Sequence, residues 1–300
     1  MVCGTHRWLN LTSNNERTMA ICWLNGRFVP EDQAQISIFD RGLLFGDGIY
    51  EVAAVFNGRL LDADLHLARL ERSLAAIALP APKSAVAWID LMQSLVDQNA
   101  ITEGLVYVQV TRGVAERDFA FPSPIIPTCF AYARQKALRT DVHARGIALH
   151  VVPDIRWARR DIKSTAMLAQ VLAKQAAKAA GAYEALMHDR GVITEGGSST
   201  VWIVQHGTVL TRPLSHAILA GITREVTLDL ASREGIPTLE RAFTLDEACE
   251  AEECFITSAT SFVLPVVRID DAVIGNGEPG PISVRLRDAY LARAASLTAA

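Results

Sequence analysis

The sequence predicts a two-domain protein of the α+β class, with a smaller α/β N-terminal domain and a larger, strand-rich C-terminal domain. Three observations support this. The chain has 300 residues, about twice the length of a typical domain. Two Asn-Gly pairs between apolar runs indicate β-hairpins in the first quarter of the chain. Beyond residue 146, short strand-like runs alternate with helical segments.

The composition narrows the class of protein. Half of the residues are hydrophobic and 21% are charged, which is typical of an ordinary globular chain. The net charge is −4 without a basic stripe, so nucleic acid is not an expected partner. No run of 18 apolar residues is present, so no membrane span is expected. The five cysteines lack zinc-site spacing, which predicts reduced thiols, a cytoplasmic protein and no metal site.

The first 19 residues are expected to be a flexible extension. Residues 1–18 are polar and aperiodic, and they lack the apolar stretch of a secretory signal. Met19 immediately precedes the first strand-like run and is the expected original start of the protein. The alternative is an ordered arm that crosses a dimer interface.

The N-terminal domain is predicted to span residues 20–136. Its hairpins turn at Asn25-Gly26 and Asn57-Gly58, pairs that tolerate the positive φ that both central residues of such turns need. The helices and strands follow the apolar periodicity. We expect a helix that is capped by Asp62 or Asp64 and ends near residue 79, a helix over 84–98, strands at 105–111 and 128–133, and a proline-rich loop between those two strands.

Residues 137–146 are polar and charged and are predicted to be a linker. The C-terminal domain is predicted to span residues 147–300. Its expected strands are 147–152, 184–188, 200–205, 208–211, 254–258 and 262–268, and its expected helices lie near 165–180, 222–234 and 281–296. A boundary between two such domains is a favoured place for a ligand site.

Lys163 is the first candidate for chemistry. It stands in Asp161-Ile-Lys-Ser-Thr, at the edge of a predicted helix whose inward face is expected to be Met167, Leu168, Val171 and Leu172. A lysine beside an apolar face is either a surface residue whose stem covers that face or a desolvated amine that attacks carbonyl groups. Position alone favours the surface interpretation.

Glu195 and two anion cradles form the second group of candidates. Glu195 precedes two glycines and three hydroxyl residues, which fits either of two interpretations. It belongs to a polar turn between strands, or its carboxylate faces a ligand at a place where the glycines let the backbone approach closely. Gly221 and Thr223 open a predicted helix whose free N–H groups suit a phosphate. The small polar run 257–261 is a second possible cradle.

Three arginines have two interpretations each. Arg69 lies near the apolar stripe of its helix, where it pairs with Glu71 or Asp64 or turns inward to a phosphate. Arg112 and Arg117 flank the proline-rich loop, where they are exposed or present a guanidinium group to a carboxylate.

Seven motifs occur in an order that resembles a known family over residues 22–290. They are Phe45-Gly-Asp-Gly-Ile-Tyr-Glu-Val, His66-Leu-Ala-Arg-Leu, Val110-Thr-Arg-Gly, Asp161-Ile-Lys-Ser, Ile193-Thr-Glu-Gly, Gly221-Ile-Thr-Arg and Phe255-Ile-Thr-Ser. The chain resembles the fold-type IV pyridoxal-phosphate-dependent (class IV) aminotransferases, most closely the bacterial D-amino-acid type. The resemblance implies their fold, whose C-terminal domain is a pseudo-barrel. It also implies a homodimer with active-site residues shared across the interface.

The resemblance also implies an activity and a role for each matching residue. The activity is ping-pong transfer of the amino group of D-amino acids, such as D-alanine, to 2-oxo acids, such as 2-oxoglutarate. Lys163 matches the Schiff-base lysine that shuttles the proton, and Glu195 matches the acid that pairs with the pyridine nitrogen. The implied phosphate contacts are Arg69, Ile222, Thr223, Ser258, Ala259 and Thr260, and the implied substrate-carboxylate contacts are Tyr50 and Arg117, the latter from the partner subunit.

Phe119 departs from the family pattern. The D-specific members carry a histidine two residues after the arginine that matches Arg117, and a phenylalanine cannot donate a hydrogen bond to a carboxylate. A lost charge-assisted contact is worth about 1.5–3 kcal/mol. Because a fold does not fix a function, three other activities stay open: a branched-chain L-amino-acid aminotransferase, an R-amine aminotransferase, and a lyase such as aminodeoxychorismate lyase. A binding protein that has lost catalysis is a further alternative, against which intact Lys163 and Glu195 argue.

Overall fold

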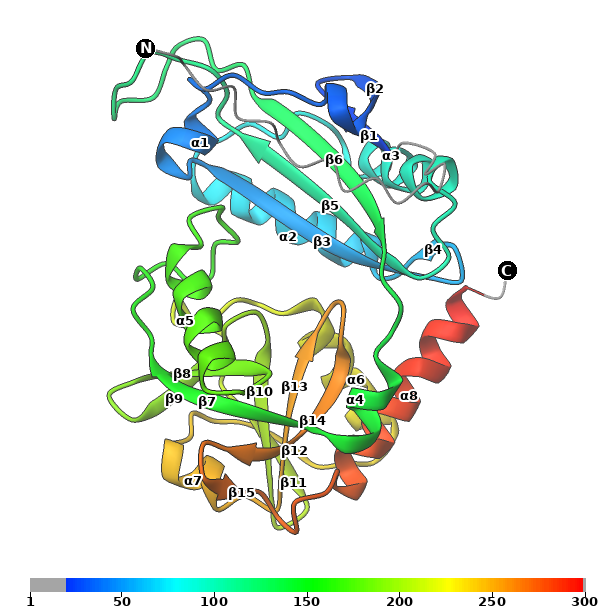
Figure 1. Cartoon of the computed structure of the whole chain (residues 1–300), viewed down its shortest axis with the longest axis vertical. Helices are drawn as coiled ribbons and strands as arrows, with labels where there is room; N and C mark the ends of the chain where they lie inside the picture. The colour runs from blue at the N-terminus through cyan, green and yellow to red at the C-terminus, as the bar shows by residue number, and fades with distance from the viewer. Residues whose placement is uncertain (1–19, 299–300) are drawn as a thin grey trace, which may run out of the picture.

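The computed structural model describes residues 20–298, which fold around two sheets that lie one above the other in Figure 1. The predicted α+β class with two sheet domains is confirmed. The predicted extension over 1–19, with its alternative as an ordered arm, lies outside the described residues. Within the described part of the chain, every helix is too short or too polar to cross a membrane.

The N-terminal domain holds a six-stranded antiparallel sheet in the order β2-β1-β6-β5-β3-β4. Both predicted hairpins are present: φ is +46° and +95° at Asn25 and Gly26, and +48° and +76° at Asn57 and Gly58. The strands are β1 (Ile21–Leu24), β2 (Arg27–Pro30), β3 (Gly48–Phe56), β4 (Arg59–Leu60), β5 (Gly104–Thr111) and β6 (Thr128–Gln135).

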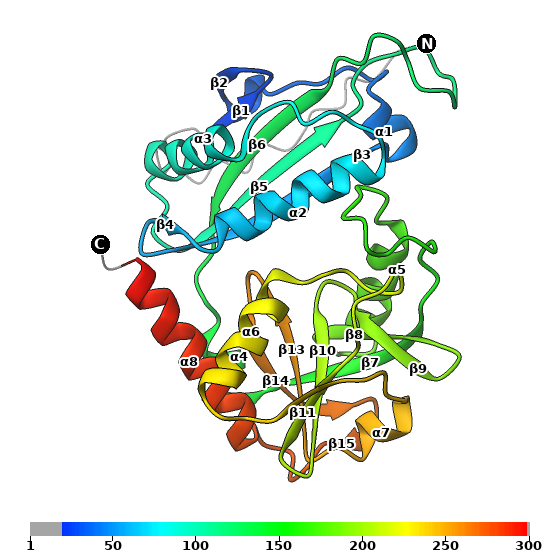
Figure 2. The same cartoon turned by 180° about the vertical axis from the view of Figure 1, so that it is seen from behind.

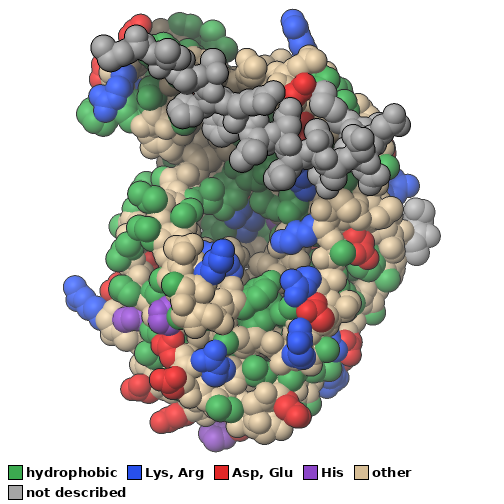
Figure 3. All heavy atoms as spheres, in the orientation of Figure 1, with side chains coloured by type: hydrophobic (Ala, Val, Ile, Leu, Met, Phe, Trp, Pro, Cys, Tyr) green, Lys and Arg blue, Asp and Glu red, His purple; other side chains and the backbone are tan. Residues whose placement is uncertain are grey.

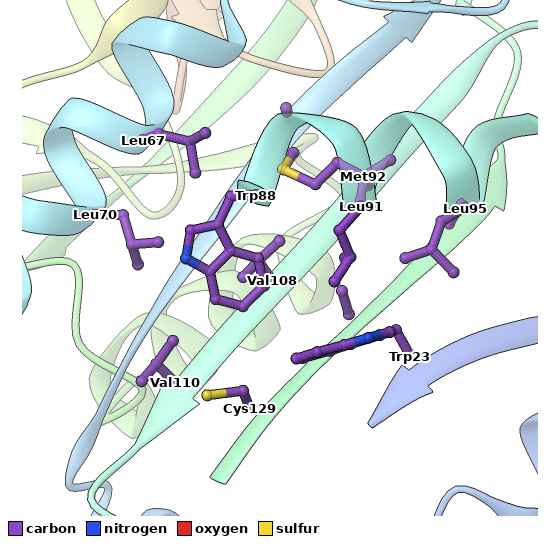
Figure 4. Close-up of a cluster of buried hydrophobic side chains, with 14 of the residues drawn as sticks. Trp23, Leu67, Leu70, Trp88, Leu91, Met92, Leu95, Val108, Val110 and Cys129 are labelled. Carbon is purple, nitrogen blue, oxygen red and sulfur yellow. The ribbon is translucent and has the colours of Figure 1, made fainter. Parts of the chain in front are cut away.

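Two helices, α2 (Ala63–Ala76) and α3 (Ala85–Gln98), cover one face of this sheet, as Figure 2 shows. Their predicted apolar stripes are buried against it. Trp88 of α3 is 2% exposed, and its ring meets Trp23 of β1 edge-on at 5.7 Å between centroids. Figure 4 shows this cluster of side chains between the helices and the strands.

Asp62 precedes α2 as predicted, but its side chain makes no capping hydrogen bond. The carboxylate instead accepts hydrogen bonds from the Tyr290 hydroxyl at 3.1 Å and from Arg293 Nη2 at 2.6 Å. Both partners lie on α8 (Pro281–Leu297), so Asp62 ties the N-terminal domain to the last helix of the chain.

The C-terminal domain holds a curled, mixed nine-stranded sheet in the order β12-β11-β10-β13-β14-β7-β8-β9, with β15 paired to β14. The six predicted strands are present; β9, β12 and β15 are additional. The strands are β7 (Ile147–Pro153), β8 (Glu184–Asp189), β9 (Val192–Gly196), β10 (Thr200–Gln205), β11 (Thr208–Thr211), β12 (Thr238–Glu240), β13 (Glu253–Ser258), β14 (Phe262–Ile269) and β15 (Ala272–Val273).

The longer helices of this domain are α5 (Leu168–Ala179), α6 (Ile222–Arg233) and α8, close to the predicted ranges. Four short elements were not predicted: the 3-10 helix η1 (Glu31–Gln33), α1 (Arg41–Phe45), α4 (Thr140–Arg145), which lies within the predicted linker, and α7 (Leu245–Cys249). The first sheet ends at Gln135 and the second begins at Ile147, while the domain boundaries at 136 and 146 stay a prediction.

The predicted inward face of α5 is wrong for three of its four residues; the fourth, Met167, is half-buried and lines the pocket described below. Leu168, Val171 and Leu172 are 72%, 60% and 52% exposed, whereas the small residues Ala173 and Ala177 are buried against β8. Small side chains let the helix approach the sheet closely, so the larger apolar side chains of α5 turn outward.

Candidate active site

A pocket of about 390 Å³ lies between the two domains. Figure 3 shows the molecule hollowed there, with hydrophobic and basic side chains inside the hollow. The predicted residues that line the pocket come from both domains: Tyr50, Arg69, Lys163, Glu195, Ile222, Thr223, Ser258, Ala259 and Thr260. Their spatial convergence makes this pocket the candidate active site.

Lys163 is held by the edge of β3 rather than by a helix. Tyr50 N donates to Lys163 O at 3.1 Å, and Thr165 N donates to Gly48 O at 2.9 Å. Ile162, on one side of the lysine, is buried in the N-terminal core. Alternation along this extended segment directs Lys163 the other way, into the pocket, where its Nζ lies 4.3 Å from the ring centre of Tyr50. The surface interpretation of Lys163 is therefore wrong.

Glu195 lies in β9, so its interpretation as part of a polar turn is also wrong. Its carboxylate is 6% exposed and forms an ion pair with Arg156 Nη1. Leu219 N lies 3.2 Å from each of the two carboxylate oxygens. Burial raises the pKa of this carboxyl, while the charge of Arg156 and the Leu219 hydrogen bond act in the opposite direction.

Arg69 lines the pocket but pairs with neither Glu71 nor Asp64. Its Nε and Nη2 donate to the two oxygens of Glu51 at 2.7 and 2.8 Å, and its Nη1 donates to Ala220 O at 2.8 Å. His66 Nδ1 lies 2.8 Å from the same carboxylate. Burial works to raise the pKa of Glu51, but the charge and hydrogen bonds of Arg69, with His66, lower it well below its usual range.

The start of α6 offers backbone donors to the pocket. Gly221 is the N-cap residue, and no side chain caps the helix there. Ile222 and Thr223, the first two helical residues, are buried and line the pocket. A Cβ on Gly221 would lie 2.8 Å from Thr200 Oγ1 and 3.2 Å from Arg224 Cβ, so a side chain at this position would crowd the cradle. The N–H groups of a helix start suit an anion.

Arg117 and Phe119 do not line this pocket. They lie on the loop between β5 and β6, where Phe119 is 79% exposed and its ring packs against Phe45 at 5.6 Å between centroids. Arg112 is fully buried rather than exposed and pairs with Asp47. Arg41 also pairs with Asp47 and donates to the backbone oxygens of 118, 119 and 120. These two buried arginines fix the loop.

Several lining residues were not predicted as site residues. They are His66 and Arg224, which stand in the quoted motifs without an assigned role, and Arg156, Arg160 and Thr200, which lie outside those motifs. Arg156 and Arg160 precede Lys163 in a segment without helical or strand periodicity, so their inward direction depends on the tertiary fold.

This combination of two sheets, a lysine and a buried carboxylate has known counterparts. The chain belongs to the amino-transferase class IV family, whose sequence profile matches residues 48–269. It is 40% identical over 269 residues to the D-alanine aminotransferase of Staphylococcus aureus (strain MSSA476), an alignment that covers 89% of this chain and 95% of that protein.

Solved structures show the same fold. The T.th. branched-chain amino acid aminotransferase with pyridoxamine 5′-phosphate superposes with a TM-score of 0.85 at 25% identity, over 93% of this chain and 95% of that one. The Escherichia coli branched-chain amino acid aminotransferase gives 0.86 at 21% identity, over 91% and 94% of the two chains. The latter likeness concerns the fold alone.

Proposed function

We propose that this protein is a pyridoxal-phosphate-dependent aminotransferase that moves the amino group of D-amino acids, such as D-alanine, to 2-oxo acids, such as 2-oxoglutarate. The observation that carries the proposal is the 40% identity to a D-alanine aminotransferase over nearly the whole of both chains. The pocket supports it, because Lys163 and Glu195 both line one cavity of a size suited to a small ligand.

The donor set of the pocket fits pyridoxal phosphate. Lys163 offers an amine for the aldehyde, Glu195 offers a buried carboxylate for the ring nitrogen, and the start of α6 offers N–H groups for the phosphate. The Ser199 hydroxyl oxygen is buried without a hydrogen-bond partner among the described residues, so the pocket wall keeps an unused polar atom. Arg69, Ser258, Ala259 and Thr260 complete the proposed phosphate contacts.

When bound, the cofactor would supply an electron sink for the charge that forms when substrate Cα loses its proton. Lys163 Nζ is the group that would take that proton and hold it for return. The Tyr50 ring beside Nζ, together with the backbone bonds to β3, restricts where this amine points. Glu195 would hold a proton at the ring nitrogen, because a buried carboxylate favours a neighbouring positive charge.

A steady-state assay tests the activity. Production of pyruvate from D-alanine should require added 2-oxoglutarate, and L-alanine should not replace D-alanine. Lys163→Ala should abolish turnover, because no other lysine stands next to Tyr50 in the described pocket. Turnover of the Lys163→Ala variant at the wild-type rate would contradict the assigned role.

We further propose a homodimer in which the loop with Arg117 and Phe119 reaches the partner's pocket. The exposed apolar side chains support an interface on one side of the molecule, where α1 and α5 lie in Figures 1 and 2. They include Phe119 and Phe121 on the loop, Phe39 and Leu43 beside or on α1, and Leu168 and Val171 on α5. Patches of this kind mark interaction sites.

Mixing two inactive variants tests the shared site. A mixed dimer of a Lys163→Ala chain and an Arg117→Ala chain has one intact site if the arginine comes from the partner. Random pairing of equal amounts should then restore about a quarter of the wild-type activity. No restoration would show that Arg117 does not act across an interface.

We also propose a cytoplasmic location. The cysteines of the described residues, Cys22, Cys129, Cys249 and Cys254, are all free. Free thiols persist in the reducing cytosol, whereas the thiols of exported proteins tend to be oxidised to disulfides. Appearance of the enzyme in a membrane or exported fraction after cell fractionation would contradict this location.

A further inference from the structure

A compact group of charges lies beside the pocket, next to Glu195. Asp154 has a fully buried carboxylate that accepts hydrogen bonds from Arg156 Nε at 2.9 Å and Nη2 at 2.6 Å. Thr194 Oγ1 donates to the same carboxylate at 2.7 Å, and Arg160 Nε lies 3.4 Å from it. Asp154 therefore fixes one edge of the guanidinium group of Arg156 through two hydrogen bonds.

The remaining nitrogen of Arg156, Nη1, points to Glu195 Oε1. The side chains of Arg156 and Glu195 are each 6% exposed, so water does not screen the pair. Burial alone would lower the pKa of Arg156, but Asp154 and Glu195 raise it above its ordinary value, so Arg156 stays charged. An ionised carboxylate is costly in a buried place unless a charged partner compensates it.

We propose that Arg156 is a positioning residue that holds the Glu195 carboxylate ionised and oriented for a protonated ring nitrogen. This inference rests on the proposed cofactor. Arg156 occupies one oxygen of Glu195, and the backbone N–H of Leu219 approaches both, so the rotation of the carboxylate is restricted. Asp154 does not touch Glu195; it acts indirectly, by holding Arg156 in position.

The other charged groups around Glu195 do not duplicate this contact. Arg212 Nη1 donates to Ile193 O at 2.7 Å and leaves the Glu195 carboxylate untouched. Arg69 is paired with Glu51, and Arg160 lies against Asp154. Of the other cations of the pocket wall, Lys163 lies beside Tyr50, whereas Lys174 pairs with Glu184 and Arg224 with Glu240. Among the described residues, Arg156 alone forms an ion pair with Glu195.

The test measures binding of pyridoxamine 5′-phosphate to the cofactor-free protein by calorimetry. This probe carries the ring nitrogen but no aldehyde, so the bond to Lys163 does not enter. Four proteins form a double-mutant cycle: wild type, Arg156→Leu, Glu195→Gln, and both changes together. We expect Arg156→Leu to weaken binding about tenfold when Glu195 is present and less than about twofold in the Glu195→Gln background.

Two further variants control for structure. Arg212→Leu removes a neighbouring arginine that touches β9 but not the carboxylate, and it should weaken binding less than about twofold. Arg156→Lys keeps the charge but cannot contact Asp154 through two nitrogens and Glu195 through a third, so it should recover the affinity only in part; it also covers the case in which Arg156→Leu does not fold. Equal weakening by Arg156→Leu in both backgrounds, or unchanged binding, would overturn the inference. Failure of the wild type to bind the probe would instead overturn the proposed cofactor.

Discussion

Glu51→Gln removes the carboxylate that pairs with Arg69 and contacts His66, which both line the pocket. The Glu51 side chain is 0% exposed and touches Arg69 at 2.7 Å and His66 at 2.8 Å. The amide has almost the same shape but no charge. Arg69, whose side chain is 6% exposed, would then keep a buried positive charge without an opposite partner.

Breaking a buried ion pair by removing one partner costs about 3–5 kcal/mol. The matched control is Glu234→Gln. Glu234 also approaches its arginine, Arg285, to 2.7 Å, but the two side chains are 36% and 53% exposed. Solvent screens that pair, so the control should cost less than about 1 kcal/mol. Burial is thus the main difference between the two substitutions.

Urea unfolding of the cofactor-free proteins at one protein concentration gives both free energies of unfolding, provided that the slope with denaturant is unchanged. A loss for Glu51→Gln no larger than that of the control would refute the reasoning.

The dependence on pH provides a second check of Glu51. Arg69 and His66 hold its pKa below the ordinary value, so its stabilisation is complete above about pH 4.3 and is lost as the pH falls further. The difference in free energy of unfolding between the wild type and Glu51→Gln should therefore stay constant between about pH 6 and 8. It should shrink only in more acidic buffer; a decline already near neutral pH would contradict the assignment.

Three further predictions concern the core and the loop. Trp88→Ala should lower the free energy of unfolding, measured by urea unfolding, by about 3–5 kcal/mol, because removal of a 2% exposed indole leaves a cavity beside Trp23. The control Val86→Ala, at a 69% exposed position of the same helix, should change this free energy little. Arg41→Gln frees the backbone of 118–120 and should raise KM for D-alanine about tenfold, while the affinity for pyridoxamine 5′-phosphate stays constant; equal weakening of both would contradict the role of the loop. Phe119→His adds a donor beside Arg117 and should lower KM for D-alanine about tenfold; an unchanged or higher KM would count against the loop as a carboxylate contact.

Much of the fold follows from local sequence patterns. The Asn-Gly turns and the stripes of α2 and α3 follow from backbone preference and helical period, and the structure confirms both. The direction of α5 could not be predicted in this way. Its apolar residues Leu168 and Val171 have helical spacing, but Ala173 and Ala177 are the residues that pack against β8. Periodicity identifies a stripe and not the surface that covers it.

The candidate site shows the same division. Ordered motifs indicated Lys163 and Glu195, whereas residue-by-residue reasoning favoured a surface lysine and a polar turn. Both interpretations were wrong because they used only the neighbouring residues in the sequence. The pairing of residues 163–165 with β3, and of β9 with β8, joins segments whose contact the local sequence does not predict. The roles of Glu51 and Arg156 could not be predicted for a related reason. Each side chain acts through a contact with a residue that is distant in the sequence.

The measurement that tests the central claim most directly is a half-reaction. The purified protein is loaded with pyridoxal phosphate, and its visible absorption is followed as D-alanine, L-leucine or R-1-phenylethylamine is added separately without a 2-oxo acid. The account predicts that D-alanine alone removes the visible band and that pyruvate forms in equal amount to the protein sites. Loss of the band with L-leucine or the amine, but not with D-alanine, would contradict the proposed function and leave the fold and the family unchanged.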